Sequence, residues 1–172
     1  MWVILIFLAS VALGQSFRVT GKAIYEAKAP VGAFQGVNST LQGQVKVNLA
    51  QGEASGEVCL DLAAWDSKEP LRDRHTRDMF EVNRFPKACL RLTGLEALGQ
   101  GQEREAVVAG LLNLHGVERP LKVKGTLRQE GNLYRFRGSF LLRLGDYGLK
   151  APTFLGMRVA EEVKVWVEVE AR

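Results

Sequence analysis

Apolar and polar residues alternate with a period of two along most of this 172-residue chain. The clearest case lies near the end, where residues 163–169 read VKVWVEV and all four valines share one parity. Successive side chains of a β-strand point to opposite faces of the sheet, so the pattern predicts a strand with one buried face. A chain built from such segments folds by covering their apolar faces, which indicates an all-β domain.

About eight segments follow this pattern, and glycine-containing turns such as Gln51-Gly52-Glu53 separate several of them. In each segment every second residue is apolar or glycine, and the segments run over residues 17–25, 41–49, 56–62, 88–94, 106–114, 121–127, 134–142 and 163–169. Tight turns between consecutive strands make antiparallel neighbours. A meander of about eight strands removes its edges by closing into an up-and-down barrel, although a two-sheet sandwich would show the same alternation.

One segment between the third and fourth expected strands breaks the alternation. Residues 63–87 read AAWDSKEPLRDRHTRDMFEVNRFPK, in which Asp66 or Ser67 could cap a short helix and Pro86 would end it. We expect this helical segment to lie across one mouth of the barrel.

Glycine recurs on the apolar parity of the expected strands, at Gly21, Gly43, Gly56, Gly94, Gly110, Gly125 and Gly138. Glycine weakens a strand interior, so its repeated use calls for a geometric reason. One interpretation is that the glycines bend the strands so that the sheet closes. The other is that the missing side chains leave room along the axis for a guest.

No charged residue falls on these apolar stretches, so a guest in the middle of the barrel should be a hydrocarbon. The side chains that we expect to line the interior and contact it are Val45, Val47, Val58, Leu60, Leu90, Val108, Leu112, Val123, Phe136, Phe140, Val165 and Val167.

Four polar residues are candidates for contacts with a ligand head group at the mouth: Arg72, Asp73, His75 and His115. The alternative for the first three is a solvated turn with local ion pairs. His115 precedes Gly116 at a strand end, so its alternative role is that of a turn residue bonded to the backbone.

The two cysteines, Cys59 and Cys89, alternate with apolar neighbours and should point outward. They lie almost symmetrically about the connecting segment, so they can face one another on adjacent antiparallel strands within disulfide reach. In an oxidising compartment we expect them to be bridged. Neither lies in a CxxC or Cys/His spacing, so no metal site is predicted.

The first 14 residues are expected to be a signal peptide, which leaves residues 15–172 as one barrel domain. Val3 to Leu13 is an apolar run too short to span a bilayer, and Ala12 and Gly14 are small residues suited to cleavage before Gln15. This predicts a periplasmic or secreted protein. No Lys or Arg precedes Val3, and an N-terminal strand or a short membrane anchor is the alternative.

Charge and motifs exclude other classes. The net charge is +4, but Lys and Arg are scattered among Asp and Glu, whereas a nucleic-acid binder gathers them on one face. Neither histidine belongs to a recognisable nucleophile elbow, HExxH helix or phosphate loop, so we do not expect an enzyme.

Three motifs carry a resemblance to a known family: RDRHTRDMFEVNRFPKACLRL, LNLHGVERPLKV and LGDYGLK followed by the valine strand. Together they resemble the YceI-like family of polyisoprenoid-binding proteins. The resemblance implies a lipocalin-like eight-stranded barrel whose pore takes an isoprenoid lipid or quinone, in an exported protein. The sequence departs from the family in its first strand, FRVTGKAIYEAK, which lacks a His-Ser segment, and at Glu118, where Thr is usual.

The leading hypothesis is therefore an exported carrier or store for an isoprenoid lipid or quinone, with no other cofactor. A dry-cored barrel that acts as a structural or stress-protective interaction module is the second, and an enzyme acting on a lipid is the third. The partners considered are the lipid, a transient membrane or membrane-protein contact and a second copy in a homodimer.

Overall fold

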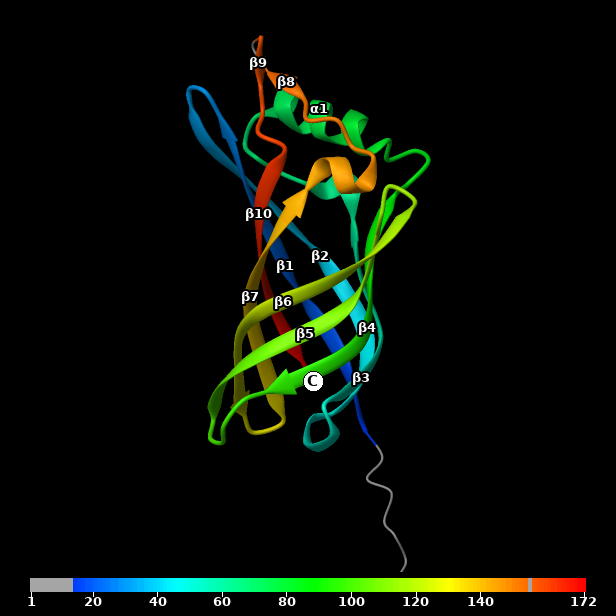
Figure 1. Ribbon diagram of the computed structural model, residues 1–172, viewed down its shortest axis with the longest axis vertical. Helices are drawn as coiled ribbons and strands as arrows, with labels where there is room; N and C mark the ends of the chain where they lie inside the picture. The colour runs from blue at the N-terminus through cyan, green and yellow to red at the C-terminus, as the bar shows by residue number, and fades with distance from the viewer. Residues whose placement is uncertain (1–13, 155) are drawn as a thin grey trace, which may run out of the picture.

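Eight antiparallel strands close into a barrel in the computed structural model, which describes residues 14–154 and 156–172 (Figure 1). The barrel strands are β1 (Gln15–Ala29), β2 (Gly32–Asn48), β3 (Glu53–Asp61), β4 (Lys87–Ala97), β5 (Glu103–Leu114), β6 (Val117–Glu130), β7 (Leu133–Arg143) and β10 (Glu162–Ala171). Each strand pairs with its neighbour in the chain, and β1 closes the ring on β10, which itself pairs with β7. The predicted all-β barrel is confirmed, and the sandwich alternative is wrong.

The remaining elements are short. They are the helix α1 (Pro70–Phe80), the hairpin strands β8 (Thr153–Phe154) and β9 (Met157–Arg158), and the 3-10 turns η1 (Leu49–Gln51), η2 (Leu62–Ala64) and η3 (Leu144–Tyr147). Figure 1 shows α1, β8 and β9 at one end of the barrel and the turns β2–β3, β4–β5 and β6–β7 at the other. No helix among the described residues is long and apolar enough to cross a membrane. The expected signal peptide lies outside the described residues, except for Gly14.

The helix lies across one end of the barrel as expected, but its ends differ from the prediction. Glu69 caps it by accepting from the backbone N–H of Leu71, and Pro70 occupies the first turn, where its missing N–H costs nothing. Asp66 and Ser67 are not caps, because the Asp66 carboxylate accepts from the Lys68 backbone N–H in the loop and the Ser67 hydroxyl donates to the Asp73 side chain. The helix ends at Glu81, whose backbone is left-handed, five residues before Pro86.

An irregularity in β2 lets one strand change its inward parity. Gly36 and Asn38 are buried on one parity and Leu41 and Val45 on the other, and the register with β1 shifts between them. Asn38 is fully buried; its amide donates to the Asp61 carbonyl at 2.7 Å and its oxygen accepts from Thr40. Such bulges increase the local twist and help a sheet to coil. Strict alternation gave no sign of this switch.

A second irregularity, in β4, corrects one of the expected inward glycines. The register with β5 shifts between Leu92 and Gly94, so that Leu92 and Leu95 both face inward. Gly94 then pairs with Ala109, which has the outward parity of β5. The prediction that Gly94 faces the interior is therefore wrong, because the bulge reverses parity at that point.

Most of the inward glycines are required by close approach of the neighbouring strand. A Cβ built on five of them would fall 1.9–2.6 Å from a carbonyl oxygen of the adjacent strand: Gly21, Gly43, Gly56, Gly110 and Gly125. At Gly138 the space is taken by the side chains of Phe136 and Val123. The structure therefore favours the first interpretation, in which glycines let the sheet bend and close. It does not support glycines as the source of room for a guest.

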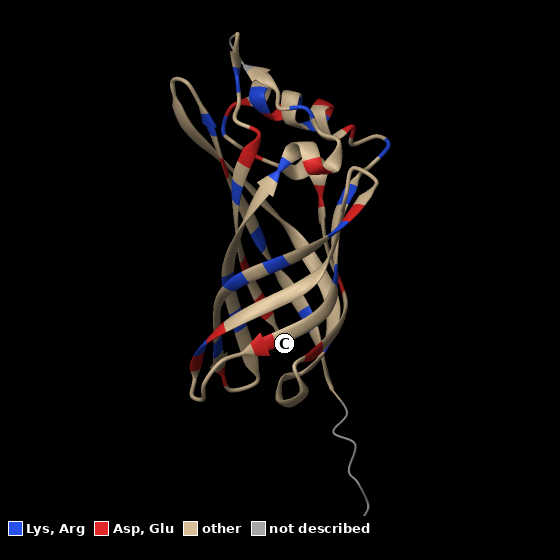
Figure 2. Ribbon diagram, in the orientation of Figure 1, with Lys and Arg blue, Asp and Glu red and all other residues tan. Residues whose placement is uncertain are grey.

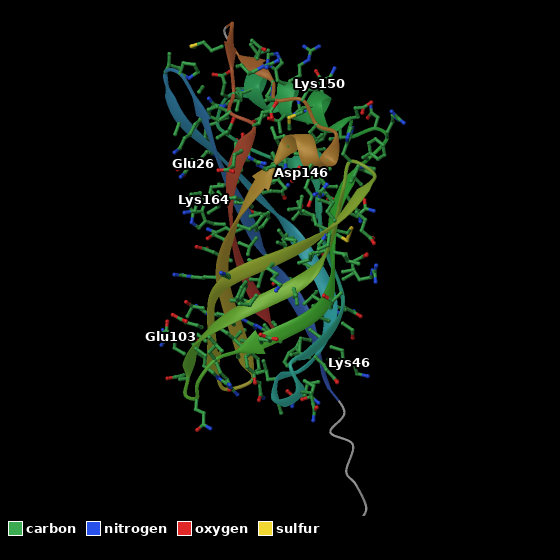
Figure 3. The ribbon with its side chains drawn as sticks, in the orientation of Figure 1. Glu26, Lys46, Glu103, Asp146, Lys150 and Lys164 are labelled. Atoms are coloured by element: carbon green, nitrogen blue, oxygen red, sulfur yellow. A yellow bond between two sulfur atoms is a disulfide. The ribbon has the colours of Figure 1, made fainter. Side chains whose placement is uncertain are left out.

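Charged side chains cover the outside of the wall. Figure 2 shows Lys, Arg, Asp and Glu spread along the strands and at both ends of the barrel, and most of these residues are exposed. The labelled side chains of Glu26, Lys46, Glu103 and Lys164 point away from the wall in Figure 3. Cross-strand ion pairs such as Lys22–Glu168, at 3.5 Å, and Arg135–Glu170, at 3.4 Å, link neighbouring strands on this outer face.

A disulfide joins Cys59 on β3 to Cys89 on β4, which are directly opposite in the register. The Glu57 carboxylate, on the same outward parity as Cys59, lies 3.4 Å from the Cys59 sulfur. Among the described residues, Glu57 and these cysteines form the one cluster of potential metal ligands. Both sulfurs are engaged in the disulfide, so this cluster is not a metal site.

Candidate functional site

An elongated cavity of about 390 Å³ runs inside the barrel. Its wall contains residues from all eight barrel strands, and the twelve side chains that the sequence analysis expects to line the interior all belong to it. Val58 and Leu60 of β3 and Val165 and Val167 of β10 lie in this wall because alternate residues of a strand share a face. Their role in holding a ligand stays a prediction.

The wall carries no charged side chain within the described part of the chain. The end farther from α1 is lined by Gln15, Phe17, Asn48 and Tyr134, the last of which meets the Phe17 ring edge-on at 5.4 Å. Gln15 begins β1 at the end of the barrel opposite α1 (Figure 1). The cavity thus offers a hydrocarbon surface along its length, with amide and phenol groups at one end.

A smaller pocket of about 80 Å³ lies beneath α1 at the other end. Tyr25 and Phe34 from the barrel and His75 and Met79 from the helix contribute to its wall. It shares four lining residues with the main cavity: Trp65, Phe80, Leu142 and Val165. Trp65 therefore stands between the two spaces.

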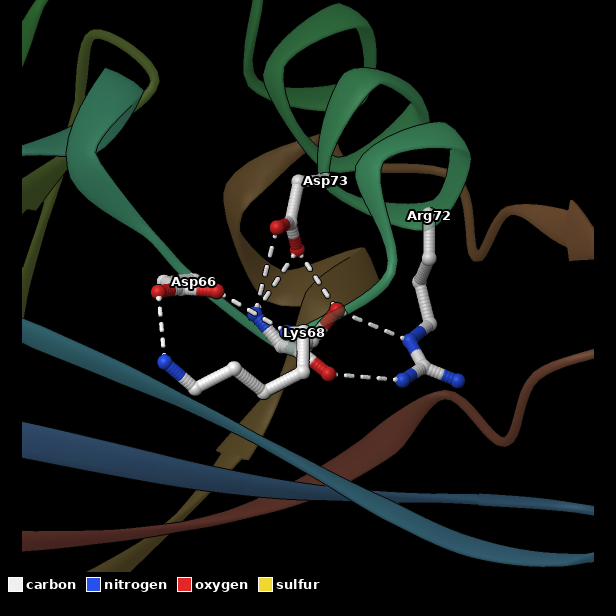
Figure 4. A network of polar contacts seen from close by, with 5 residues as sticks. Asp66, Lys68, Arg72 and Asp73 are labelled. Carbon is white, nitrogen blue, oxygen red and sulfur yellow. Dashed lines mark hydrogen bonds and ion pairs between the residues drawn. The ribbon is translucent and has the colours of Figure 1, made fainter.

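Two of the expected head-group residues hold the loop before α1 instead (Figure 4). The carboxylate of Asp73, only 8% exposed, accepts from the Ser67 hydroxyl at 2.6 Å and from the Ser67 backbone N–H at 3.0 Å. The Arg72 guanidinium donates to the Ser67 hydroxyl and carbonyl at 2.9 and 3.0 Å and lies over the Phe34 ring. Asp73 lies in neither cavity wall, whereas Arg72 and His75 line the smaller pocket.

His115 lies outside both cavity walls and ties three segments together. Its Nδ1 is 3.0 Å from the Tyr147 carbonyl and its Nε2 is 2.5 Å from the Glu81 carboxylate. The hydrogen bond from His115, together with one from Arg84, lowers the pKa of Glu81 below its ordinary value. His115 is therefore a turn residue with φ of 54° that fastens the β5–β6 turn to α1 and η3, and not a mouth residue.

Two buried donors at the α1 end make no hydrogen bond of good geometry within the described residues: Nε1 of Trp65 and the hydroxyl of Tyr25, which lies near the hydroxyls of Ser67 and Thr76. Both residues are more than nine-tenths buried, at 8% and 9% exposed. Burial raises the pKa of the Tyr25 phenol, while the hydroxyls of Ser67 and Thr76 partly offset the rise, so it keeps its proton at neutral pH. Sequence reasoning missed both residues, because nothing in an alternating pattern marks a donor without a partner.

The YceI-like domain family matches residues 15–171. This chain belongs to the YceI-like family. Curated relatives include a UPF0312 protein of Pseudomonas savastanoi pv. phaseolicola, 34% identical over 119 residues, which cover 64% of this chain and 60% of that protein. A UPF0312 protein of Pseudomonas putida strain W619 is 32% identical over 129 residues, covering 69% and 65%. The match thus spans less than two thirds of either relative.

Solved structures share the fold of this YceI-like domain. BcnA of Burkholderia cenocepacia superposes with a TM-score of 0.74 at 20% identity, covering 88% of this chain and 96% of that one. A polyisoprenoid binding domain from Saccharophagus degradans, implicated in plant cell wall breakdown, gives a TM-score of 0.63 at 16% identity, with 94% and 95% covered. At these identities the likeness concerns the fold.

Proposed function

We propose that this YceI-like protein binds one long apolar lipid of the isoprenoid or isoprenoid-quinone class inside the barrel and acts as its exported carrier or store. The observation that carries the proposal is the elongated cavity whose described wall holds no charged side chain. Water gains little from such a surface, so a hydrocarbon chain is its natural occupant. The volume of about 390 Å³ falls in the range of ligand pockets.

The energetics of a hydrocarbon guest agree with this proposal. Each buried methylene contributes about 0.8 kcal/mol, so a five-carbon isoprene unit contributes up to about 3–4 kcal/mol before entropy and incomplete burial are subtracted. A few units therefore suffice for tight binding. The tail supplies affinity, and polar groups near the ends select the head group.

Two further observations support the finer parts of the proposal. Family membership and the shared fold with a polyisoprenoid binding domain favour an isoprenoid over other lipids. The short apolar segment at residues 3–13, with the small residues Ala12 and Gly14 at the expected cleavage positions, favours export. We infer binding without turnover, an interpretation supported by the described residues of the main cavity wall, among which there is no carboxylate, imidazole or amine to move a proton.

The test fills the cavity at mid-barrel. Val108 lies in the wall and Val107, the preceding residue of β5, has the outward parity and pairs with Lys124. Mass spectrometry of organic extracts should find a bound lipid in the purified wild type and in Val107→Trp. The amount of lipid per protein should be at least tenfold lower in Val108→Trp. Equal thermal stability of the two variants would attribute the loss to the blocked cavity.

The second candidate, a dry-cored interaction module, makes the opposite prediction. If the wild type carries no lipid from its native host and takes up none from prenyl lipid supplied in detergent, the carrier proposal is wrong. Equal lipid content in Val107→Trp and Val108→Trp would also contradict it, because the guest would then lie outside the barrel.

A further inference from the structure

We propose that Trp65 and Tyr25 form the head-group subsite and donate hydrogen bonds to a neutral carbonyl-type oxygen on the lipid. The inference rests on the proposed function and makes it more specific. It places the polar end of the guest beneath α1 and the tail toward Gln15 and Tyr134. It also selects quinone-type lipids over prenyl diphosphates.

The first step is that both donors are fixed in place. The Tyr25 ring packs edge-on against Trp65, with centroids 5.1 Å apart, and against Phe34 at 6.1 Å. Gly36 lies opposite Tyr25 in β2, and a Cβ there would come 2.3 Å from the phenol ring. Trp65 immediately precedes Asp66, whose backbone exchanges two hydrogen bonds with Val37 of β2. The two side chains are therefore held by the barrel and the loop before any ligand arrives.

The second step is that both groups require an acceptor. An indole N–H only donates, and Tyr25 stays protonated because burial raises its pKa. Neither makes a hydrogen bond of good geometry in the described protein, and the hydroxyls of Ser67 and Thr76 near Tyr25 already donate to Asp73 and to the Arg72 carbonyl. A buried donor without a well-formed hydrogen bond is costly. Trp65 lies in the walls of both cavities, so an oxygen at the end of a guest in the tunnel could reach this position.

The third step concerns charge. Of the charged residues near this subsite, Arg72 is bonded to Ser67 and stacked on Phe34, and Asp73 is a carboxylate bonded to Ser67. His75 completes the polar side of the smaller pocket. A diphosphate brings several negative charges and needs cations free to pair with it. A pocket whose one guanidinium is already engaged and which adjoins a carboxylate suits a neutral acceptor, such as a quinone carbonyl.

Three probes with the same twenty-carbon prenyl tail distinguish the contribution of the head group to affinity from that of the tail. They are a prenylated benzoquinone, the unsubstituted hydrocarbon and the prenyl diphosphate. Calorimetric titration of the delipidated protein should give the quinone the lowest Kd. Tyr25→Phe keeps the ring and removes only the hydroxyl, and Trp65→Phe replaces the indole with a smaller ring that lacks the donor. Each should raise the quinone Kd, relative to the hydrocarbon Kd of the same variant, about three- to tenfold. Trp166→Phe, on the outward parity of β10 and in neither cavity wall, should change neither Kd. Tyr134→Phe, at the other end of the same cavity, tests the reverse orientation of the guest.

A spectroscopic readout supplements the affinities. The indole N–H resonance of Trp65, assigned by its absence in Trp65→Phe, should move downfield with the quinone and not with the hydrocarbon. Retained hydrocarbon binding shows that each variant is folded.

The outcomes distinguish the two proposals. If the wild type binds none of the probes, the proposed function fails. If it binds the quinone and hydrocarbon but Trp65→Phe and Tyr25→Phe bind the quinone as the wild type does, the head-group assignment is wrong and lipid binding stands. Selective loss of quinone affinity in Tyr134→Phe, or tighter binding of the diphosphate than of the quinone, would also overturn the assignment.

Discussion

At the scale of single residues, the contact between His115 and Glu81 holds the turn β5–β6 against the end of α1. Because the Glu81 pKa lies below its ordinary value of 4.5, its stabilising contribution is complete above that pH. The contribution is lost as the pH falls through the lowered pKa of the folded state. Acid should therefore weaken the contact between the β5–β6 turn and the end of α1.

The corresponding prediction is that Glu81→Gln is less sensitive to acid than the wild type. Urea unfolding between pH 7 and pH 3 should show the wild type losing its stability advantage over the variant below pH 4.5. In a His115→Ala background the same substitution should have a much smaller effect, because the partner is absent. An unchanged difference at pH 7 and pH 3 would contradict the prediction.

The wall residues could be predicted from the sequence because a period of two assigns each strand residue to a face. Val58, Val108 and Val165 needed no other information. The functions of the polar residues could not be predicted, since hydrogen bonding depends on neighbours far apart in the chain. His115 reaches Glu81 and Tyr147, across 34 and 32 residues respectively. Asp73 bonds to the nearer Ser67, but only because the loop before α1 folds back on the helix.

At the scale of elements, close approach of strands explains why glycine recurs on the inward face. A Cβ at Gly125 would lie 1.9 Å from the Arg137 carbonyl oxygen of β7, and Gly125 also faces Gly138 across the strand pair. Two bulky residues at these positions would force β6 and β7 apart. The tight curvature of the wall therefore depends on missing side chains at particular rungs.

This reasoning predicts different outcomes for two glycines that the sequence alone treats alike. Gly125→Ala should lower the free energy of unfolding by about 3 kcal/mol, because the new methyl collides with backbone that cannot move aside. Gly94→Ala should cost much less, since its Cβ would meet its nearest atom, the Gly52 carbonyl oxygen, at an ordinary 3.5 Å. Denaturant unfolding of both variants checks this, and equal losses would contradict it.

The ends of the helix and the positions of the bulges could not be predicted from the sequence pattern. The existence and place of α1 followed from the break in alternation, and Pro70 was available as a start signal. Its cap was wrong because Asp66 and Ser67 were attractive capping residues that the folded loop uses elsewhere. The bulges at Asn38 and Gly94 could not be predicted, since a register depends on the neighbouring strand.

At the scale of the whole molecule, closure of the sheet depends on all eight strands together. The alternation within each strand therefore did not decide between a barrel and a sandwich. The pairing of β1 with β10 supplies the answer, because it joins the two ends of the chain and removes both edges. One covalent link supports this closed wall. It ties β3 to β4 on either side of the segment that carries α1.

Removing that link should cost stability without emptying the cavity. The disulfide closes a loop with a sequence separation of 30, for which the chain-entropy estimate is about 3–4 kcal/mol. A Cys59→Ser, Cys89→Ser double variant should unfold at correspondingly lower urea concentration, and reductant should shift the wild type to the same midpoint. Its lipid content should equal that of the wild type, because the sulfurs project to the outer face with Glu57. Loss of lipid at full folding would contradict this.

The two ends of the barrel are not equivalent, since α1 covers one and short turns surround the other. With the polar group of a guest anchored under the helix, surplus chain length has to emerge among the turns, beside Gln15 and Asn48. The cavity would then enclose a fixed length of prenyl chain, and the remainder of a longer chain would stay exposed outside the barrel. A membrane or a recipient protein could bind this exposed end of the tail before the head group leaves its subsite.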